Sequence, residues 1–194
     1  MTVDLSPKLA ARLEALPAGL RSHTQRSRAI ARELAQASGV DPDLADVAAA
    51  AHDVARAFPT EELVALAREL GLAVDDVEAE VPLLLHGPVA AELLRREGAV
   101  TDPEVLDAIR WHSTARPGLS ALGKVVFLAD KLDPEKGRRS PTARQLHALA
   151  LRDLDAAVLA CLERELARML REGHLIHPAS VEARNELRLK RAGP

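Results

Sequence analysis

The chain has 194 residues and a formal net charge of −3, and 47% of its residues are hydrophobic although only 2% are aromatic. This length suits one domain with a substantial core, which must be aliphatic because aromatic residues are so few. The net negative charge excludes a general attraction to nucleic acid or to an anionic membrane surface, and no apolar run is long enough to span a bilayer. The single cysteine, Cys161, excludes an internal disulfide and favours a reducing, cytoplasmic location.

Residues typical of helix starts and helix ends recur along the first half of the chain. Alanine and leucine dominate the composition, and both favour helices. Ser6-Pro7 and Asp41-Pro42 each place a capping side chain before a proline that starts a helix, and Gly39 ends the helix between them. We expect helices near residues 7–16, 22–38, 42–58, 60–70, 75–81 and 88–94.

The second half continues the helical pattern. Asp102-Pro103 starts a helix that ends at Trp111-His112, and Ser120 precedes a strongly apolar helix that Asp133-Pro134 stops. We expect helices near residues 103–112 and 122–132, a charged loop at 135–140, one or two long helices over 142–171 and a last short helix from 178.

The helical pattern also defines the expected fold class. No alternating pattern of useful length indicates a strand, and neither a repeat nor a linker is evident. The sequence therefore predicts a single all-α domain over residues 1–194, a helical bundle in which a core near residues 19–140 is followed by a helical C-terminal extension near residues 141–190.

A histidine and an aspartate stand side by side at His52-Asp53, within an alanine-rich stretch that we expect to be helical. Adjacent helix positions lie about 100° apart, so both side chains can lean toward one point from the same turn. An imidazole nitrogen and a carboxylate aimed at one point suit a divalent metal ion. The alternative is a His-Asp pair on a helix surface, which a two-residue motif cannot exclude by itself.

Asp130 ends one of the most apolar segments of the chain, Val125–Asp130. A buried carboxylate is costly unless it is paired or coordinated. Asp130 therefore belongs either to a buried salt bridge, with Lys124 or Arg56, or to a metal site, and its place after the histidines favours metal. Together the candidate metal ligands are His23, His52, Asp53, His86, His112 and Asp130.

The other histidines differ in how well they fit this series. His86 can instead cap the helix that follows it, and His112 ends a helix whose dipole favours a cation. If both bind metal, they supply two more nitrogen ligands, which are enough for a second ion provided that the Asp53 carboxylate binds both ions. The three remaining histidines lie in the C-terminal helices, where we expect surface or capping residues: His147, His174 and His177.

The order His, His-Asp, His, His, Asp is similar to that of the HD superfamily of metal-dependent phosphohydrolases. More narrowly, the chain resembles the YqeK-like family of bacterial HD-domain hydrolases, which split diadenosine tetraphosphate symmetrically into two ADP. The resemblance covers roughly residues 21–139. The matching segments are Arg21–Thr24, Ala51–Arg56, Leu85–Ala91, Ile109–Thr114 and Leu128–Pro134, of which the third and the last are specific to this family.

The resemblance implies a dinuclear metal centre and favours iron. Imidazole and carboxylate ligands also suit manganese, zinc, nickel or cobalt, and suit magnesium or calcium less well. Two such ions can share a hydroxide, which we expect to attack a phosphorus atom in line, with ADP as a good leaving group. In this arrangement the first ion is held by His23, His52, Asp53 and Asp130, and the second by the bridging Asp53, His86 and His112.

Substrate phosphates require fixed cations near the metal ligands. Arg56 lies three residues after Asp53 and shares its helix face, and Lys124 lies six residues before Asp130, which we expect to place it on roughly the same side. We assign Asp53, Arg56 and Lys124 to catalysis. The expected substrate contacts are Arg56, Thr114, Arg116, Lys124, Lys136 and Arg138. Two alternatives remain open: Arg56 can be a simple surface arginine, and the run that includes Lys136, Arg138 and Arg139 can be a solvated loop.

Three positions depart from the family pattern. Ala115 stands where the family has a glycine, Gly123 stands in place of a glutamate, and Lys136 stands in place of an arginine. None of them removes a candidate ligand, but we expect the change at Gly123 to alter the packing that supports the helix that carries Asp130.

Two other classes of function remain open. One is another HD phosphohydrolase that acts on a nucleotide or a guanosine polyphosphate, and the other is a non-catalytic, metal-stabilised regulatory domain. The segment Leu85–Pro88 argues against another HD phosphohydrolase. The candidate ligands with cations nearby argue against a non-catalytic domain, because a purely structural metal site does not need an open coordination position. We expect a dinucleoside polyphosphate as substrate and neither nucleic acid nor membrane as partner, and we leave a homodimer open.

Overall fold

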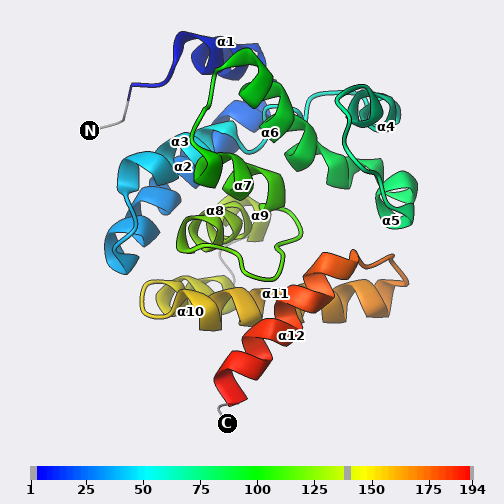
Figure 1. The fold of residues 1–194 in the computed structure, drawn as a ribbon. Coiled ribbons are helices and arrows are strands. Elements are labelled where there is room, and N and C mark those ends of the chain that lie inside the picture. Colours follow the sequence, from blue (N-terminus) through cyan, green and yellow to red (C-terminus); the bar gives the residue numbers. More distant parts are fainter. Residues whose placement is uncertain (1–3, 138–140, 193–194) are drawn as a thin grey trace.

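The structure is a computed structural model that describes residues 4–137 and 141–192, without the side chains of residues 136, 137, 141 and 142. Within these residues every regular element is a helix, which confirms the all-α prediction (Figure 1). None of the described helices is long and apolar enough to cross a membrane. The elements are α1 (Pro7–Ala15), α2 (Ala18–Ser38), α3 (Pro42–Ala51), α4 (Thr60–Glu69), α5 (Asp76–Glu80), the 3-10 helix η1 (Pro82–Leu85), α6 (His86–Glu97), α7 (Pro103–Trp111), α8 (Ala121–Lys131), α9 (Pro134–Gly137), α10 (Pro141–Ala150), α11 (Leu154–Glu172) and α12 (Pro178–Ala192).

Helix α8 lies at the centre of the bundle, in contact with α2, α3, α7 and α11 (Figure 1). Ser120 caps its first turn by accepting a hydrogen bond from the backbone N–H of Gly123. Eight of its eleven residues are buried, among them Phe127 and Leu128, and full burial of each such side chain contributes about 1.5–3 kcal/mol. The same packing carries the Asp130 carboxylate into the interior, where it is 4% exposed.

The alanine run of α3 lets this helix approach its neighbours closely. Ala48, Ala49, Ala50 and Ala51 are each at most 1% exposed, and α3 packs against α2, α7 and α8. Because these side chains are small, the end of α3 reaches the middle of the bundle. The residues that directly follow Ala51, His52–Ala55, are therefore buried.

The prediction that this helix continues to residue 58 was wrong. Helix α3 ends at Ala51, with His52 as its C-cap. The chain then tightens into turns closed by hydrogen bonds between residues three apart, from Val54 N–H to the Ala51 carbonyl at 3.3 Å and from Arg56 N–H to the Asp53 carbonyl at 3.0 Å. His52 and Asp53 thus extend from the end of the helix rather than from its side.

Several other boundaries differ from expectation. Helix α2 begins at Ala18, directly after Pro17, and α6 extends to Glu97. The charged loop expected at 135–140 is helical over Pro134–Gly137, and residues 138–140 lie outside the described part. Over residues 142–171, where one or two long helices were predicted, the chain forms two, with Asp153 as the N-cap of the second.

The C-terminal helices cover one side of α8. Helix α11 packs against α8, α10 and α12, and Figure 1 shows α11 and α12 together on one side of the bundle. Gly173 ends α11 in the left-handed conformation at φ 69°. This packing places one face of α11 opposite the part of α8 that carries Asp130.

Gly87, in the first turn of α6, permits close contact between α6 and the end of α7. A Cβ atom at this position would lie 2.7 Å from the Arg110 carbonyl oxygen, 3.0 Å from that of Ile109 and 3.3 Å from the His112 ring. Since two of these neighbours are backbone atoms, a side chain at Gly87 would push α7 away. The glycine therefore determines how close His86 and His112 can come.

We expect Gly87→Ala to lower the free energy of unfolding by about 1–3 kcal/mol, because the added methyl overpacks a backbone contact. Chemical denaturation measures the change. Gly19→Ala is the matched control, since its Cβ would meet nothing within 4 Å and alanine favours a helix more than glycine does. An equal loss of stability in both variants would contradict the packing role of Gly87.

Candidate active site

The six residues predicted as metal ligands come together at the centre of the bundle, in two groups that share one aspartate. In each group the potential ligand atoms lie within 4.8 Å of one another, and every member is buried. The first group consists of His23, His52, Asp53 and Asp130, and the second of Asp53, His86 and His112.

The Asp53 carboxylate is the shared group, and its two oxygens face different histidines. Oδ1 lies 3.1 Å from His86 Nε2 and 3.6 Å from His112 Nε2. Oδ2 lies 3.5 Å from His52 Nε2 and 3.6 Å from His23 Nε2. Within the described residues, neither oxygen accepts a hydrogen bond, although both are buried. A buried carboxylate without donors requires positive charge beside each oxygen.

Three of the imidazoles are oriented by the backbone in the same way. His52 Nδ1 lies 2.7 Å from the Ala49 carbonyl oxygen, and His112 Nδ1 lies 2.8 Å from that of Ile109. His86 Nδ1 likewise faces the carbonyl of Leu83. In each case the carbonyl belongs to the residue three positions earlier, so Nδ1 donates and the neutral ring leaves Nε2 unprotonated.

The Nε2 atoms of four histidines converge in two pairs. His23 Nε2 lies 3.2 Å from His52 Nε2, and His86 Nε2 lies 2.9 Å from His112 Nε2. Two lone pairs that face each other need a shared proton or a metal cation between them. Ligands bound to one ion at about 2.1 Å are separated by roughly 3.0–3.4 Å, so these four histidines and Asp53 fit the coordination of divalent metal.

The electrostatics of the first group also require positive charge. Burial lowers the pKa of His52, but the charge of Asp53 more than compensates and raises it. Burial raises the pKa of Asp53, but its imidazole neighbours, His52 foremost, hold it far below the ordinary value. In the second group, burial lowers the pKa of His112 to about 4. His112 is therefore neutral near pH 7, which is the form that binds a metal.

His23 is oriented by a carboxylate instead of a carbonyl. Its Nδ1 lies 2.5 Å from Asp133 Oδ2, and Asp133 in turn accepts hydrogen bonds from Arg26 at 2.6 and 2.9 Å. Burial raises the pKa of Asp133, but Arg26 and His23 lower it to about 2. From the sequence, Asp133 was predicted only to end a helix; its place in the family-specific segment Leu128–Pro134, three residues after Asp130, was the available signal.

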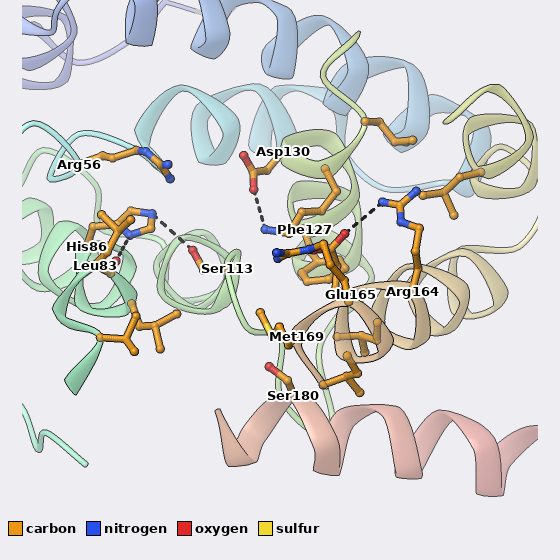
Figure 2. Close-up of a pocket in the computed structure, with 18 of the residues that line it drawn as sticks. Arg56, Leu83, His86, Ser113, Phe127, Asp130, Arg164, Glu165, Met169 and Ser180 are labelled. Atoms are coloured by element: carbon orange, nitrogen blue, oxygen red, sulfur yellow. Dashed lines mark hydrogen bonds and ion pairs between the residues drawn. The ribbon is translucent and has the colours of Figure 1, made fainter. Parts of the chain in front are cut away.

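A cavity of about 740 Å³ opens beside the two groups (Figure 2). His86 and Asp130 line it, and so does Arg56, whose Nη1 lies 3.9 Å from Asp53 Oδ1. Lys131 also lines the cavity, with Nζ 2.8 Å from Asp130 Oδ2. Asp130 thus forms a salt bridge, but with Lys131 rather than with either partner considered from the sequence, and its Oδ1 still lies 3.1 Å from His23 Nε2.

A family model described as "HD domain" matches residues 20–135, the part of the chain that contains all six candidate ligands. The chain belongs to the HD domain family. Symmetrical bis(5'-nucleosyl)-tetraphosphatases from Halalkalibacterium halodurans and Bacillus subtilis are 34% and 33% identical to this HD protein, over 87% and 80% of this chain and 88% and 82% of theirs. A solved structure of a predicted HD superfamily hydrolase involved in NAD metabolism, from Clostridium acetobutylicum, superimposes with a TM-score of 0.88 at 28% identity, covering 94% of this chain and 96% of that one.

Two cations assigned to the HD site from the sequence lie elsewhere. Lys124 Nζ pairs with Asp155 at 2.6 Å, and Arg116 pairs with Asp107 at 3.0 Å. Both line a separate, much smaller pocket. The assignment of Lys124 was wrong because six residues rotate a helix by about 600°, which leaves Lys124 some 120° away from Asp130.

Of the remaining predicted substrate contacts, Thr114 is described by the structure and does not line the HD cavity. Thr114 is 7% exposed, and its carbonyl accepts a hydrogen bond from the Ser180 hydroxyl at 2.8 Å. The side chain of Lys136 and the whole of Arg138 and Arg139 lie outside the described residues.

Two departures from the family pattern have local structural explanations. Ala115 adopts a left-handed conformation at φ 59°, which costs an L-residue roughly 1–2 kcal/mol and which a glycine, the residue expected here from the family resemblance, adopts without that cost. A Cβ at Gly123 would lie 2.6 Å from Leu119 Cδ1. Gly123 therefore makes room for Leu119 against α8.

A third group of potential ligands, Asp75, Glu78 and His177, joins α12 to the start of α5. His177 Nδ1 accepts a hydrogen bond from the Ala179 N–H at 3.1 Å, so its Nε2 carries the proton and faces Asp75 at 3.4 Å. A protonated nitrogen cannot bind a metal, and His177 caps α12, as predicted, but is buried. The other two C-terminal histidines lie nearer the surface, His147 beside Glu33 and His174 beside Glu172.

Asp53→Ala should abolish activity and lower the metal content of the purified protein, because each oxygen of Asp53 faces one of the two groups. Elemental analysis together with an activity assay measures both effects. Asp43→Ala provides the control, since the Asp43 side chain is 60% exposed. An active, metal-loaded Asp53→Ala protein would refute the bridging assignment.

Asp133→Ala should weaken metal binding by about 10- to 100-fold, the usual effect of removing a carboxylate that orients a histidine ligand. Competition with a chelator gives the affinity, and Asp133→Glu should restore part of it. Asp46→Ala removes another buried aspartate that accepts two hydrogen bonds from an arginine and should lower stability only. Equal metal affinity in the two alanine variants would exclude a positioning role for Asp133.

Proposed function

We propose that this protein is a metal-dependent hydrolase that cleaves diadenosine tetraphosphate, and related dinucleoside polyphosphates, symmetrically into two ADP. The observation that carries the proposal is the Asp53 carboxylate between two pairs of converging imidazole nitrogens, directly beside a cavity lined by cations. The relatives named symmetrical bis(5'-nucleosyl)-tetraphosphatase support the choice of substrate.

The proposed metal centre is dinuclear. His23, His52, Asp53 and Asp130 would hold one ion, and Asp53 would share the second with His86 and His112. When bound, the ions would supply Lewis acidity for the phosphoryl oxygens and lower the pKa of water. Among the metals that suit this mixed donor set, we propose iron on the strength of the family resemblance.

The reaction adds one water molecule across the central phosphoanhydride bond. The water oxygen bonds to one of the two inner phosphorus atoms, the bridging P–O bond breaks, and each half leaves as ADP. Because ADP is a stable anion, its departure needs little help from a general acid. The protein's main task is thus to hold a highly charged phosphate chain in position.

Arg56 and Lys131 are the proposed phosphate ligands within the HD core. Arg56 is about one-third exposed and extends into the cavity beside Asp53. Lys131 is held next to Asp130, and although burial lowers its pKa, the charge of Asp130 raises it overall. Both side chains therefore present a fixed positive charge within reach of the metal ligands.

Product analysis by chromatography tests the reaction. Purified protein loaded with iron(II) or manganese should convert diadenosine tetraphosphate to ADP alone. ATP and AMP as products would show that a different phosphorus atom is attacked. The absence of turnover, with substrates of other HD phosphohydrolases then accepted, would refute the proposed substrate.

Arg56→Ala should raise KM for diadenosine tetraphosphate by about tenfold while the metal content stays unchanged, since a charged hydrogen bond to phosphate is lost. Steady-state kinetics and elemental analysis measure the two quantities. Arg68→Ala, an exposed arginine of α4, should leave both unchanged. If Arg56→Ala kept the wild-type kcat and KM, Arg56 would not contact the substrate.

A further inference from the structure

The cavity has apolar surfaces on both sides of the metal ligands, which metal chemistry alone does not require. The first surface is formed by Val81, Leu83 and Leu84, just before α6. The second belongs to α11, and Figure 2 shows it across Asp130 from Leu83. The ligand groups are thus flanked by two places where an aromatic base can be buried.

The second surface is a stripe on α11 with cations at its edge. Leu162, Leu166 and Met169 line the cavity at positions four and three residues apart, which places them on one helix face. Arg164 and Arg168 line the same cavity and lie one helical turn apart. The part of the cavity formed by α11 therefore combines an apolar stripe with two guanidinium groups, whose backbone positions lie on a different face of the helix and whose long side chains reach the cavity.

Both arginines have partners that a phosphate could replace. Arg164 pairs with Glu165 at 3.4 Å, and Arg168 pairs with Glu165 at 3.1 Å and with Glu172 at 2.6 Å. The two arginine side chains are 41% and 40% exposed, and ion pairs this exposed contribute little to stability. A phosphate gains the same charged hydrogen bonds without a large loss elsewhere.

The extent of the cavity argues for a ligand with two nucleosides. Its volume of about 740 Å³ lies in the usual range for organic ligands, roughly 300–1,000 Å³. A mononucleoside polyphosphate needs one apolar surface next to the metal centre and leaves the other unused. A substrate with a nucleoside at each end of its phosphate chain uses both.

The α11 surface also lies outside the segment that defines the family. The HD domain model ends at residue 135, whereas α11 spans Leu154–Glu172. The HD core therefore supplies the metal ligands with Arg56 and Lys131, and the second apolar surface comes from the C-terminal extension.

We propose that α11 is the binding site for the second nucleotide unit of the substrate, and thereby selects dinucleoside over mononucleoside polyphosphates. Its base would lie on Leu162, Leu166 and Met169, and its phosphates would bind Arg164 and Arg168. This inference rests on the proposed function, because it assigns the two ends of that substrate to two surfaces of one cavity.

The double variant Arg164→Gln/Arg168→Gln tests the cationic part in the full-length, metal-loaded enzyme. KM for diadenosine tetraphosphate should rise roughly 10- to 100-fold, as expected when charged hydrogen bonds to phosphate are lost. The inhibition constant of ADP, which has one nucleoside and lacks the phosphates of the second nucleotide unit, should change less than about threefold, because it binds through the HD core. Metal content should not change.

Met169→Gln tests the apolar part, since it keeps the length of the side chain but makes the platform polar. It should also raise KM for the dinucleoside substrate without affecting the mononucleoside inhibitor. Two neighbours on α11 serve as controls: Leu170→Gln, at a side chain 72% exposed, and Arg171→Gln, at an exposed position. Neither lines the cavity, and neither should change KM.

The outcomes separate this inference from the proposed function. If the wild-type enzyme does not cleave diadenosine tetraphosphate, both fail. If it does, and the α11 variants keep the wild-type KM, the proposed function stands and the second site is refuted. An equal loss of affinity for both nucleotides would also refute it, because α11 would then bind the phosphate chain and not a second nucleoside.

Discussion

The buried Asp53 carboxylate is the constraint around which the rest of the structure is arranged. It lies in the centre of the bundle, and among the described residues neither of its oxygens accepts a hydrogen bond. Isolated negative charge in such a place is strongly unfavourable, so the surroundings must bring compensating charge to both oxygens. Four imidazoles face it, two at each oxygen, and their Nε2 atoms converge at distances that suit a metal ligand sphere, so a bound cation would supply the charge that the neutral rings do not. The geometry of one side chain thus connects the stability of the core to its chemistry.

Helix ends, rather than helix faces, supply most of the ligands. His52 and His112 are C-caps and His86 begins α6, and each ring is fixed by a carbonyl three residues earlier. The chain is therefore still nearly helical at each histidine, which orients the ring without any distant partner. Small residues complete the arrangement, because the alanines of α3 and Gly87 of α6 allow the backbones to approach until the imidazole nitrogens face each other. His23 differs: it lies within α2, and a carboxylate from beyond α8, Asp133, holds it.

The cavity joins two parts of the chain with different tasks. The segment that matches the HD domain holds every metal-ligand candidate of the central cluster, and its own cations, Arg56 and Lys131, reach only the part of the cavity next to them. Helix α11 completes the opposite side with an apolar stripe and two arginines. If α11 binds the second nucleotide unit as proposed, the reaction centre and this part of the substrate site come from different segments of the chain.

The sequence by itself determined the helical fold and the candidate ligands at its centre. Periodicity and caps predict helices whatever surrounds them, and charged or metal-binding side chains in apolar, alanine-rich segments reveal a buried site because burial must be compensated. The contacts of the longer cations were decided by tertiary structure. Lys124 lies on α8 with Asp130 but turns toward Asp155 on α11, and Arg116 turns to Asp107, whereas Lys131, adjacent to Asp130, faces the cavity. A flexible side chain can reach any of several partners from one backbone position, so only the packing of α11, α7 and α8 against one another determines which partner it meets.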